Sequence, residues 1–193
     1  MKIKELCVKY GSNKTKEYQQ SFAPIYDFLC SKLSAENVLE VGVGYTKMMQ
    51  KYITESTIPT FKYKAGASLK VWRDYFPNAQ VYGLDIDERA RVENEERIHF
   101  YLIDSTNKEQ ITELMNKIDK QFDLIVDDGD HSKRGQIATA LNLLPYMKKG
   151  GMYFIEDTKH APQVMEALKD YKPFLFDWTV NGEGNDRLIF IQL

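Results

Sequence analysis

The chain has 193 residues, of which 43% are hydrophobic and 28% are charged, and its formal net charge at pH 7 is −2. Such a composition is typical of a globular protein with a sizeable core, and we expect a single domain spanning residues 1–193. The nearly balanced charge gives no reason to expect nucleic acid or an anionic membrane as the main partner.

The cysteine content and the N-terminus bear on where the protein works. Cys7 and Cys30 are the only cysteines, which are too few for a disulfide framework and favour buried thiols in a reducing compartment. The N-terminus lacks an apolar signal core, and no apolar run reaches about 18 residues. We therefore expect a cytoplasmic protein that does not cross a membrane.

Two stretches in the first 65 residues lack a clear apolar period. Residues 1–16 are polar and interrupted by glycine, which predicts a loop or a loosely attached N-terminal arm. Residues 45–65 mix aromatic and basic side chains, and we interpret them as an insertion that forms a lid or an acceptor-binding wall, with a plain surface loop as the alternative. Between them, residues 17–33 carry apolar residues at helical spacing, and Pro24 could mark the helix start.

The remaining chain alternates between strand-like and helix-like patterns. Strands are expected at residues 37–44, 79–84, 99–103, 122–126, 152–155, 173–180 and 187–193, and helices at residues 66–76, 109–118, 137–147 and 161–168. This alternation predicts an α/β fold with a Rossmann-like, doubly wound seven-stranded sheet, mostly parallel and covered by helices on both faces. The last two strands flank a glycine-rich segment and are expected to form an antiparallel C-terminal hairpin.

Carboxylates recur at the ends of the first five of these strands. They are Glu40, Asp85, Asp104, the pair Asp127 and Asp128, and the pair Glu156 and Asp157. In a parallel sheet these strand ends share one edge, and ligands bind outside that edge. The sequence therefore predicts an acidic rim, made of these residues, at which the ligands bind.

One half of the acidic rim suits a nucleotide-like cofactor. Gly42 and Gly44 predict a turn where the backbone can approach a ligand closely, although a lone GxG pattern also fits an ordinary tight turn. Asp85 could accept hydrogen bonds from two ribose hydroxyls, and Asp104 from an adenine amino group. Glu40 would repel a pyrophosphate but would attract an ammonium group, which favours S-adenosylmethionine over NAD.

Several motifs together resemble one enzyme family. They are Val38–Gly44, Gly66–Pro77, Val81–Asp87, Asp127–His131, Gly150–Asp157 and the N-terminal Lys9–Lys14. This set is similar to class I S-adenosylmethionine-dependent methyltransferases, and within them to the metal-dependent sugar O-methyltransferases of the macrocin and mycinamicin type. The resemblance covers residues 8–193 and implies S-adenosylmethionine as the cofactor, with Ser68 and Asp127 on the cofactor side. Residues 45–65 depart from the family because they are longer than its corresponding segment.

The resemblance also implies a magnesium site formed by Asp128, Glu156 and Asp157, with His131 as the general base. Three carboxylates suit Mg²⁺ or another hard divalent cation better than zinc. Because consecutive strand residues point to opposite faces, Glu156 and Asp157 can reach one ion only if the strand ends there and the chain bends. An imidazole can take up a proton near neutral pH, although a histidine at position 131 could also be a capping or surface residue.

These inferences predict an S-adenosylmethionine-dependent, divalent-metal-dependent O-methyltransferase that acts on a sugar hydroxyl, such as one on a deoxyhexose of a glycan or glycoside. Two alternatives stay open. One is a catechol-type O-methyltransferase that acts on a small vicinal diol, and the other is a non-catalytic S-adenosylmethionine-binding module. The expected partner is a sugar or glycan acceptor, and a homo-oligomer is compatible with the sequence.

Overall fold

The computed structural model describes residues 1–15, 20–45, 47, 64–93, 95–179 and 186–193. Its helices are α1 (Ile3–Tyr10), α2 (Ala23–Cys30), α4 (Ala67–Tyr75), α5 (Lys108–Ile118), α6 (Lys133–Leu143) and α7 (Ala161–Ala167). Its strands are β1 (Asn37–Val41), β2 (Gln80–Asp85), β3 (Ile98–Leu102), β4 (Phe122–Asp127), β5 (Met147–Glu156), β6 (Phe174–Asp177) and β7 (Arg187–Gln192). Short 3-10 turns at Glu88–Ala90, Leu144–Tyr146 and Lys169–Tyr171 connect some of these elements.

The seven strands form one sheet in the order β3-β2-β1-β4-β5-β7-β6. The first five strands of the chain pair in parallel, whereas β7 runs antiparallel to β5 and β6 runs antiparallel to β7. The chain winds outward from β1 to β3 and then returns to place β4 on the other side of β1, which makes the β1–β4 junction a topological switch point. The predicted mostly parallel sheet with an antiparallel C-terminal hairpin is confirmed.

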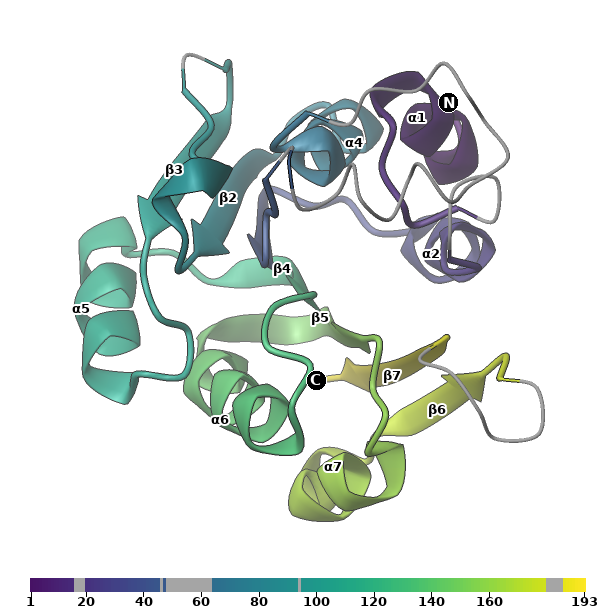
Figure 1. Ribbon diagram of the computed structural model, residues 1–193, viewed down its shortest axis with the longest axis vertical. Helices are drawn as coiled ribbons and strands as arrows, with labels where there is room; N and C mark the ends of the chain where they lie inside the picture. Colours follow the sequence, from purple (N-terminus) through teal and green to yellow (C-terminus); the bar gives the residue numbers. More distant parts are fainter. Residues whose placement is uncertain (16–19, 46, 48–63, 94, 180–185) are drawn as a thin grey trace.

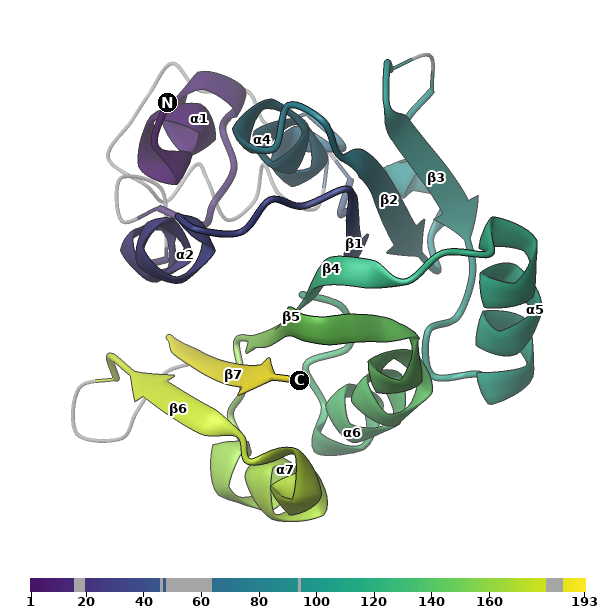
Figure 2. The same ribbon diagram turned by 180° about the vertical axis from the view of Figure 1, so that it is seen from behind.

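Helices cover both faces of the sheet, with α1, α2 and α4 on one face and α5, α6 and α7 on the other (Figures 1 and 2). Each face of the sheet packs against its helices in a hydrophobic core, and successive residues of a strand point into the two cores alternately. Phe154 of β5 packs edge-on against Tyr26 of α2 in one core, and Tyr153 lies in the other. The central strands β1 and β4 are buried along their whole length, as expected for strands covered on both faces.

The N-terminal segment corrects one sequence-based expectation. Part of the predicted arm, residues 1–16, forms the helix α1, whose Ile3, Leu6 and Cys7 are buried in the core. These three residues have helical spacing, but charged residues between them hide the pattern in so short a segment. Gly11 ends α1 in a left-handed conformation, with φ of 74°, so the chain changes direction there.

The start of β5 corrects a second expectation. The helix expected at residues 137–147 ends at Leu143, and the strand already begins at Met147. Pro145 lies in the turn between them and cannot donate the backbone hydrogen bond that would continue the helix. Gly150 lies inside β5 with φ of 82°, where the register between β4 and β5 shifts.

The region around α2 agrees with the sequence. Pro24 lies in the first turn of α2, as expected for a helix start. Cys7 and Cys30 are both buried, and burial raises the pKa of each thiol to about 12. The expected burial of both thiols is therefore confirmed.

Two further expectations concern the insertion and the membrane. Most of the predicted insertion at 45–65, namely residue 46 and residues 48–63, lies outside the described residues. Among the helices that the structure describes, none has the length and apolar character needed to span a bilayer.

The packing of α1 can be tested with a matched pair of leucine substitutions. Leu6 of α1 is 1% exposed, whereas Leu141 of α6 is 47% exposed. Leu6→Ala leaves a cavity in the core and should lower the free energy of unfolding by about 2–4 kcal/mol, whereas Leu141→Ala should lower it by less than about 1 kcal/mol. Urea unfolding measures both values. Equally small losses would show that α1 is not part of the core.

Candidate functional site

The carboxyl ends of β1 and β4 meet at a glycine turn. Gly42 in this turn has φ of 85°, and a Cβ there would lie 2.0 Å from the backbone oxygen of Asp128. The backbone N–H of Asp128 donates to the Val41 oxygen at 2.9 Å. Only glycine tolerates both the positive φ and the close approach. The turn after β1 therefore touches the acidic segment after β4, at the switch point of the sheet.

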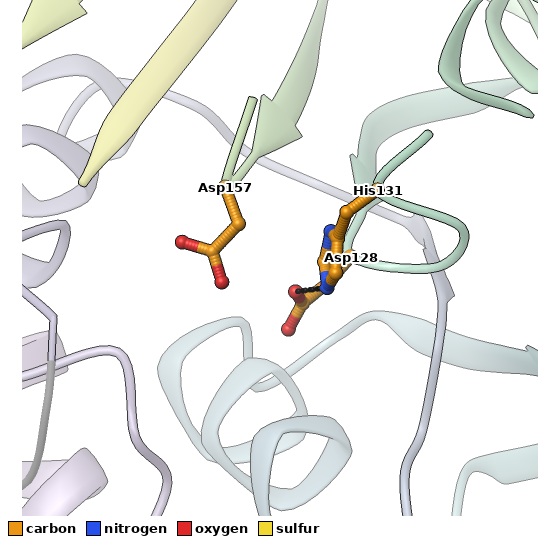
Figure 3. Close-up of side chains that lie close together, drawn as sticks. All are labelled: Asp128, His131 and Asp157. Atoms are coloured by element: carbon orange, nitrogen blue, oxygen red, sulfur yellow. Dashed lines mark ion pairs between the residues drawn. The ribbon is translucent and has the colours of Figure 1, made fainter. Parts of the chain in front are cut away.

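Asp128, His131 and Asp157 form a cluster at this edge (Figure 3). One donor atom from each residue lies within 4.8 Å of the donor atoms of the other two. Nε2 of His131 lies 3.9 Å from Oδ1 of Asp128, and the two side chains are 40% and 15% exposed. Asp157 points into the same space from the end of β5 (Figure 3). We refer to these three residues as the cluster. Its partly exposed side chains make it accessible to a ligand.

The end of β5 sends its two acidic side chains to different places. The strand ends at Glu156, and Asp157 adopts a left-handed φ of 52°, which is the bend that the sequence required. Asp157 joins the cluster, where it accepts a hydrogen bond from Gln20 Nε2 at 2.6 Å. The Glu156 carboxylate is fully buried and accepts hydrogen bonds from Lys14 and from the Tyr26 hydroxyl. A role for Glu156 as an ion ligand stays a prediction.

Lys14 forms ion pairs with three carboxylates of the acidic rim. The sequence did not identify it as a site residue. Its Nζ lies 3.1 Å from Glu40 Oε1, 2.9 Å from Asp128 Oδ2 and 2.8 Å from Glu156 Oε2. The Lys14 side chain is only 1% exposed. The only sequence signal for it was the resemblance of Lys9–Lys14 to a family motif, because a short polar segment has no apolar period.

One ammonium group for three carboxylates leaves an excess of negative charge in a buried place. Burial alone would lower the pKa of Lys14, but its three carboxylate partners outweigh burial and hold that pKa well above the ordinary value. Burial raises the pKa of Glu40, and Lys14 opposes this rise. Burial, followed by the negative charge of Asp128, raises the pKa of Asp157 to about 7. Such a site is stabilised by an added cation.

The cluster fits the hard divalent cation that the sequence predicts. Ligands of Mg²⁺ lie about 2.1 Å from the ion, so two ligands on opposite sides are about 4.2 Å apart. The cluster spans at most 4.8 Å between donor atoms, so a small contraction suffices. Lys14 holds Oδ2 of Asp128, whereas Oδ1 is the oxygen nearest to His131. Two carboxylates and one imidazole are therefore available to such an ion.

Two of the predicted cofactor residues, Asp85 and Asp104, shape turns at the acidic rim. Oδ2 of Asp85 accepts hydrogen bonds from the backbone N–H groups of Val43 and Gly44 at 2.9 and 3.0 Å. Oδ1 of Asp104 accepts from the backbone and the hydroxyl of Thr106 at 2.9 and 2.7 Å. Each carboxylate keeps free lone pairs that could accept from a ligand, so both roles with a cofactor stay predictions.

The other predicted cofactor side chains, Glu40, Ser68 and Asp127, are buried. Glu40 accepts hydrogen bonds from Ser68 and from Trp72, in addition to its ion pair with Lys14. Asp127 accepts from a backbone N–H two residues further on, and burial raises its pKa to about 8. Glu40 is thus already paired with a cation of the protein, the ammonium group of Lys14. The contacts of Glu40, Ser68 and Asp127 with a cofactor stay predictions.

Comparison with known proteins identifies related sequences. Residues 63–158 match a family model described as a methyltransferase domain. The 8-demethyl-8-alpha-L-rhamnosyl tetracenomycin-C 2'-O-methyltransferase of Streptomyces olivaceus is 30% identical over 173 residues, which cover 86% of this chain and 40% of that protein. The mycinamicin VI 2''-O-methyltransferase of Micromonospora griseorubida is 32% identical over 157 residues, which cover 80% of this chain and 35% of that protein. The chain thus spans less than half the length of these curated relatives.

A solved structure shares the fold over almost the whole chain. It is the MycE methyltransferase from the mycinamycin biosynthetic pathway, in complex with Mg, SAH and mycinamycin VI. The two chains superpose with a TM-score of 0.73 and 25% identity, over 99% of this chain and 54% of that one.

A matched pair of glycine substitutions tests the contact between the glycine turn and the segment after β4. Gly42 and Gly150 have similar φ values of 85° and 82°, but a Cβ at Gly150 would meet nothing within 4 Å. Gly150→Ala should cost about 1–2 kcal/mol of unfolding free energy from backbone strain alone. Gly42→Ala should cost at least about 2 kcal/mol more, because the new methyl group collides with the backbone of Asp128. Equal losses in urea unfolding would contradict the close contact.

Proposed function

Because the chain belongs to the class I S-adenosylmethionine-dependent methyltransferases, we propose that it transfers a methyl group from S-adenosylmethionine to a sugar hydroxyl with the help of a divalent cation. The observation that carries this proposal is the cluster of Asp128, His131 and Asp157 beside the turn at Gly42. It places possible ion ligands and a proton acceptor within reach of one another. The relatives named for rhamnosyl tetracenomycin-C and mycinamicin VI support a sugar-bearing acceptor.

In this proposal the cofactor lies along the carboxyl edge from β1 to β3. Gly42 and Gly44 let the backbone approach it, while Asp85 and Asp104 accept from its ribose and its adenine. The position of this turn at the switch point of the sheet supports the assignment, because doubly wound folds bind their ligands there.

Asp128 and Asp157 hold the divalent cation in this proposal. Because Lys14 holds one oxygen of Asp128, the other oxygen is left on the side of the cluster. A bound divalent cation supplies positive charge that lowers the pKa of a sugar hydroxyl. Glu156 is a further candidate ligand if its contact with Lys14 is exchanged for one with the ion.

His131 accepts the proton of the sugar hydroxyl. Its Nε2 lies on the side of Asp128, and this carboxylate stabilises the imidazolium that forms. The hydroxyl oxygen forms a bond to the methyl carbon of S-adenosylmethionine as the carbon–sulfur bond breaks, and the bonding electron pair remains on sulfur. Much of the rate arises from holding oxygen and methyl group in near-attack geometry.

An acceptor screen separates this proposal from its two alternatives. A catechol-type enzyme would methylate small aromatic vicinal diols and leave deoxysugar glycosides unchanged. A non-catalytic module would bind S-adenosylmethionine and methylate neither class of acceptor.

A cytoplasmic location and a homo-oligomeric state stay predictions.

His131→Ala should lower the turnover number by about 10²–10⁴-fold, because the hydroxyl loses its proton acceptor. Affinity for S-adenosylhomocysteine should stay within about twofold, since the imidazole acts on the acceptor and not on the cofactor. His160→Ala is the control, because His160 is exposed at the start of α7. Transfer of a labelled methyl group measures turnover. Near-normal turnover in His131→Ala would remove the base assignment, and a large loss of Mn²⁺ affinity would make His131 an ion ligand instead.

Substitution of the carboxylates in the cluster tests the ion site. Asp128→Asn and Asp157→Asn should each weaken Mn²⁺ binding by more than about tenfold, because each removes a charged oxygen ligand. Asp130→Asn is the matched control from the same segment. Asp130 is exposed and accepts from the backbone and the hydroxyl of Ser132, the N-cap residue of α6, both at 2.9 Å. Calorimetric titration with Mn²⁺ measures the three affinities, and full wild-type activity in excess EDTA would contradict the ion requirement.

A further inference from the structure

Lys14 and a divalent cation would share the same carboxylates. Nζ of Lys14 lies within 2.9 Å of Asp128 Oδ2 and 2.8 Å of Glu156 Oε2, and Asp128 also belongs to the cluster in which an ion fits. We propose that Lys14 is a positioning residue that acts as a resident counter-ion: it holds the acidic rim together without the ion, and it lowers the affinity of the rim for the ion. This inference rests on the proposed ion-dependent function.

Lys14 cannot leave the acidic rim easily. Its backbone oxygen accepts from the N–H of Ala23 at 2.9 Å, and the preceding Asn13 accepts from the N–H of Gln20 at 3.0 Å. These bonds fix the backbone of the segment against the start of α2, and the side chain is 1% exposed. The ammonium group therefore stays at the acidic rim whether or not Asp128 also binds an ion.

Glu40 gives the ammonium group a partner that is not a member of the cluster. Its Oε1 lies 3.1 Å from Nζ of Lys14, and its Oε2 accepts from Trp72 Nε1 at 3.2 Å. Lys14 can thus yield Asp128 to an ion and still remain paired. A buried ammonium without a partner would be too costly, so Glu40 makes the exchange possible.

The formal charges fit this exchange. When Glu40, Asp128, Glu156 and Asp157 are all ionised, Lys14 compensates one of their four negative charges. A divalent cation together with S-adenosylmethionine, whose net charge is one positive unit, would neutralise the three that remain. Without the ammonium group, the acidic rim would carry one further negative charge and would attract cations more strongly.

Lys14→Met and Lys148→Met form a matched pair for the test. Lys148 pairs with Glu36 and Asp123 at 2.9 and 3.0 Å, near the start of β5 and away from the acidic rim. Lys14→Met should lower the midpoint of thermal unfolding by about 10 °C and tighten Mn²⁺ binding by at least about tenfold, because the ion replaces the missing charge. Lys148→Met should lower the midpoint by less than about 4 °C and leave Mn²⁺ affinity within about twofold.

The opposite signs of the two effects distinguish a counter-ion from a merely structural lysine. A lower or unchanged Mn²⁺ affinity in Lys14→Met would overturn the proposal. If this variant is unfolded without the ion, Mn²⁺ must restore its folded circular dichroism spectrum, and failure to do so would also overturn it.

Glu40→Gln tests the same exchange by removing the charge of the carboxylate that would retain Lys14. It should weaken Mn²⁺ binding about threefold, because Lys14 then pairs more strongly with Asp128 and competes with the ion. Tighter Mn²⁺ binding in this variant would count against the exchange. Absence of Mn²⁺ binding to the wild-type protein would overturn both the ion requirement of the proposed function and this inference, whereas unchanged binding in Lys14→Met would overturn only the inference.

Discussion

The ion pairs of Lys14 are the interaction on which the part of the acidic rim made of Glu40, Asp128 and Glu156 depends. Carboxylates that are buried together repel one another and lose their hydration, so they stay ionised and close only if positive charge is supplied. The strand ends supply the acids Glu40, Asp128 and Glu156, whereas the cation comes from the segment that follows α1. The N-terminal part of the chain therefore contributes to the site, because Lys14 follows shortly after α1.

Backbone conformation decides which acid points where. Asp157 leaves β5 with a positive φ, which separates its carboxylate from that of Glu156 and turns it toward His131. Gly42 follows β1 and has no side chain, so the segment of Asp128 after β4 can approach the turn. These two backbone features place one carboxylate on each side of the same space, and neither could be achieved by a regular strand.

The sequence predicted which acidic residues follow the strand ends, because the ends of parallel strands share one edge whatever their separation along the chain. Asp85, Asp104, Asp128 and Asp157 follow this rule. Lys14 does not: it contacts Asp128 and Glu156 across 114 and 142 residues, from a segment without periodic apolar residues. The start of β5 was misjudged for a related reason, since Met147 extends the helical pattern of α6 although the tertiary fold places it in a strand.

A resident ammonium group also separates folding from ion binding. In many small metal sites the ligands come together only when the ion binds, so that the apo protein is unfolded. Here one charge built into the chain holds Asp128 and Glu156 at their strand ends before any ion is needed. Stability of the fold and affinity for the ion therefore place opposite demands on Lys14. A stronger ion pair between Lys14 and the carboxylates stabilises the fold, but it leaves less negative charge to bind a divalent cation. The third carboxylate, Glu40, relaxes this opposition, because it retains the ammonium group whichever cation Asp128 contacts.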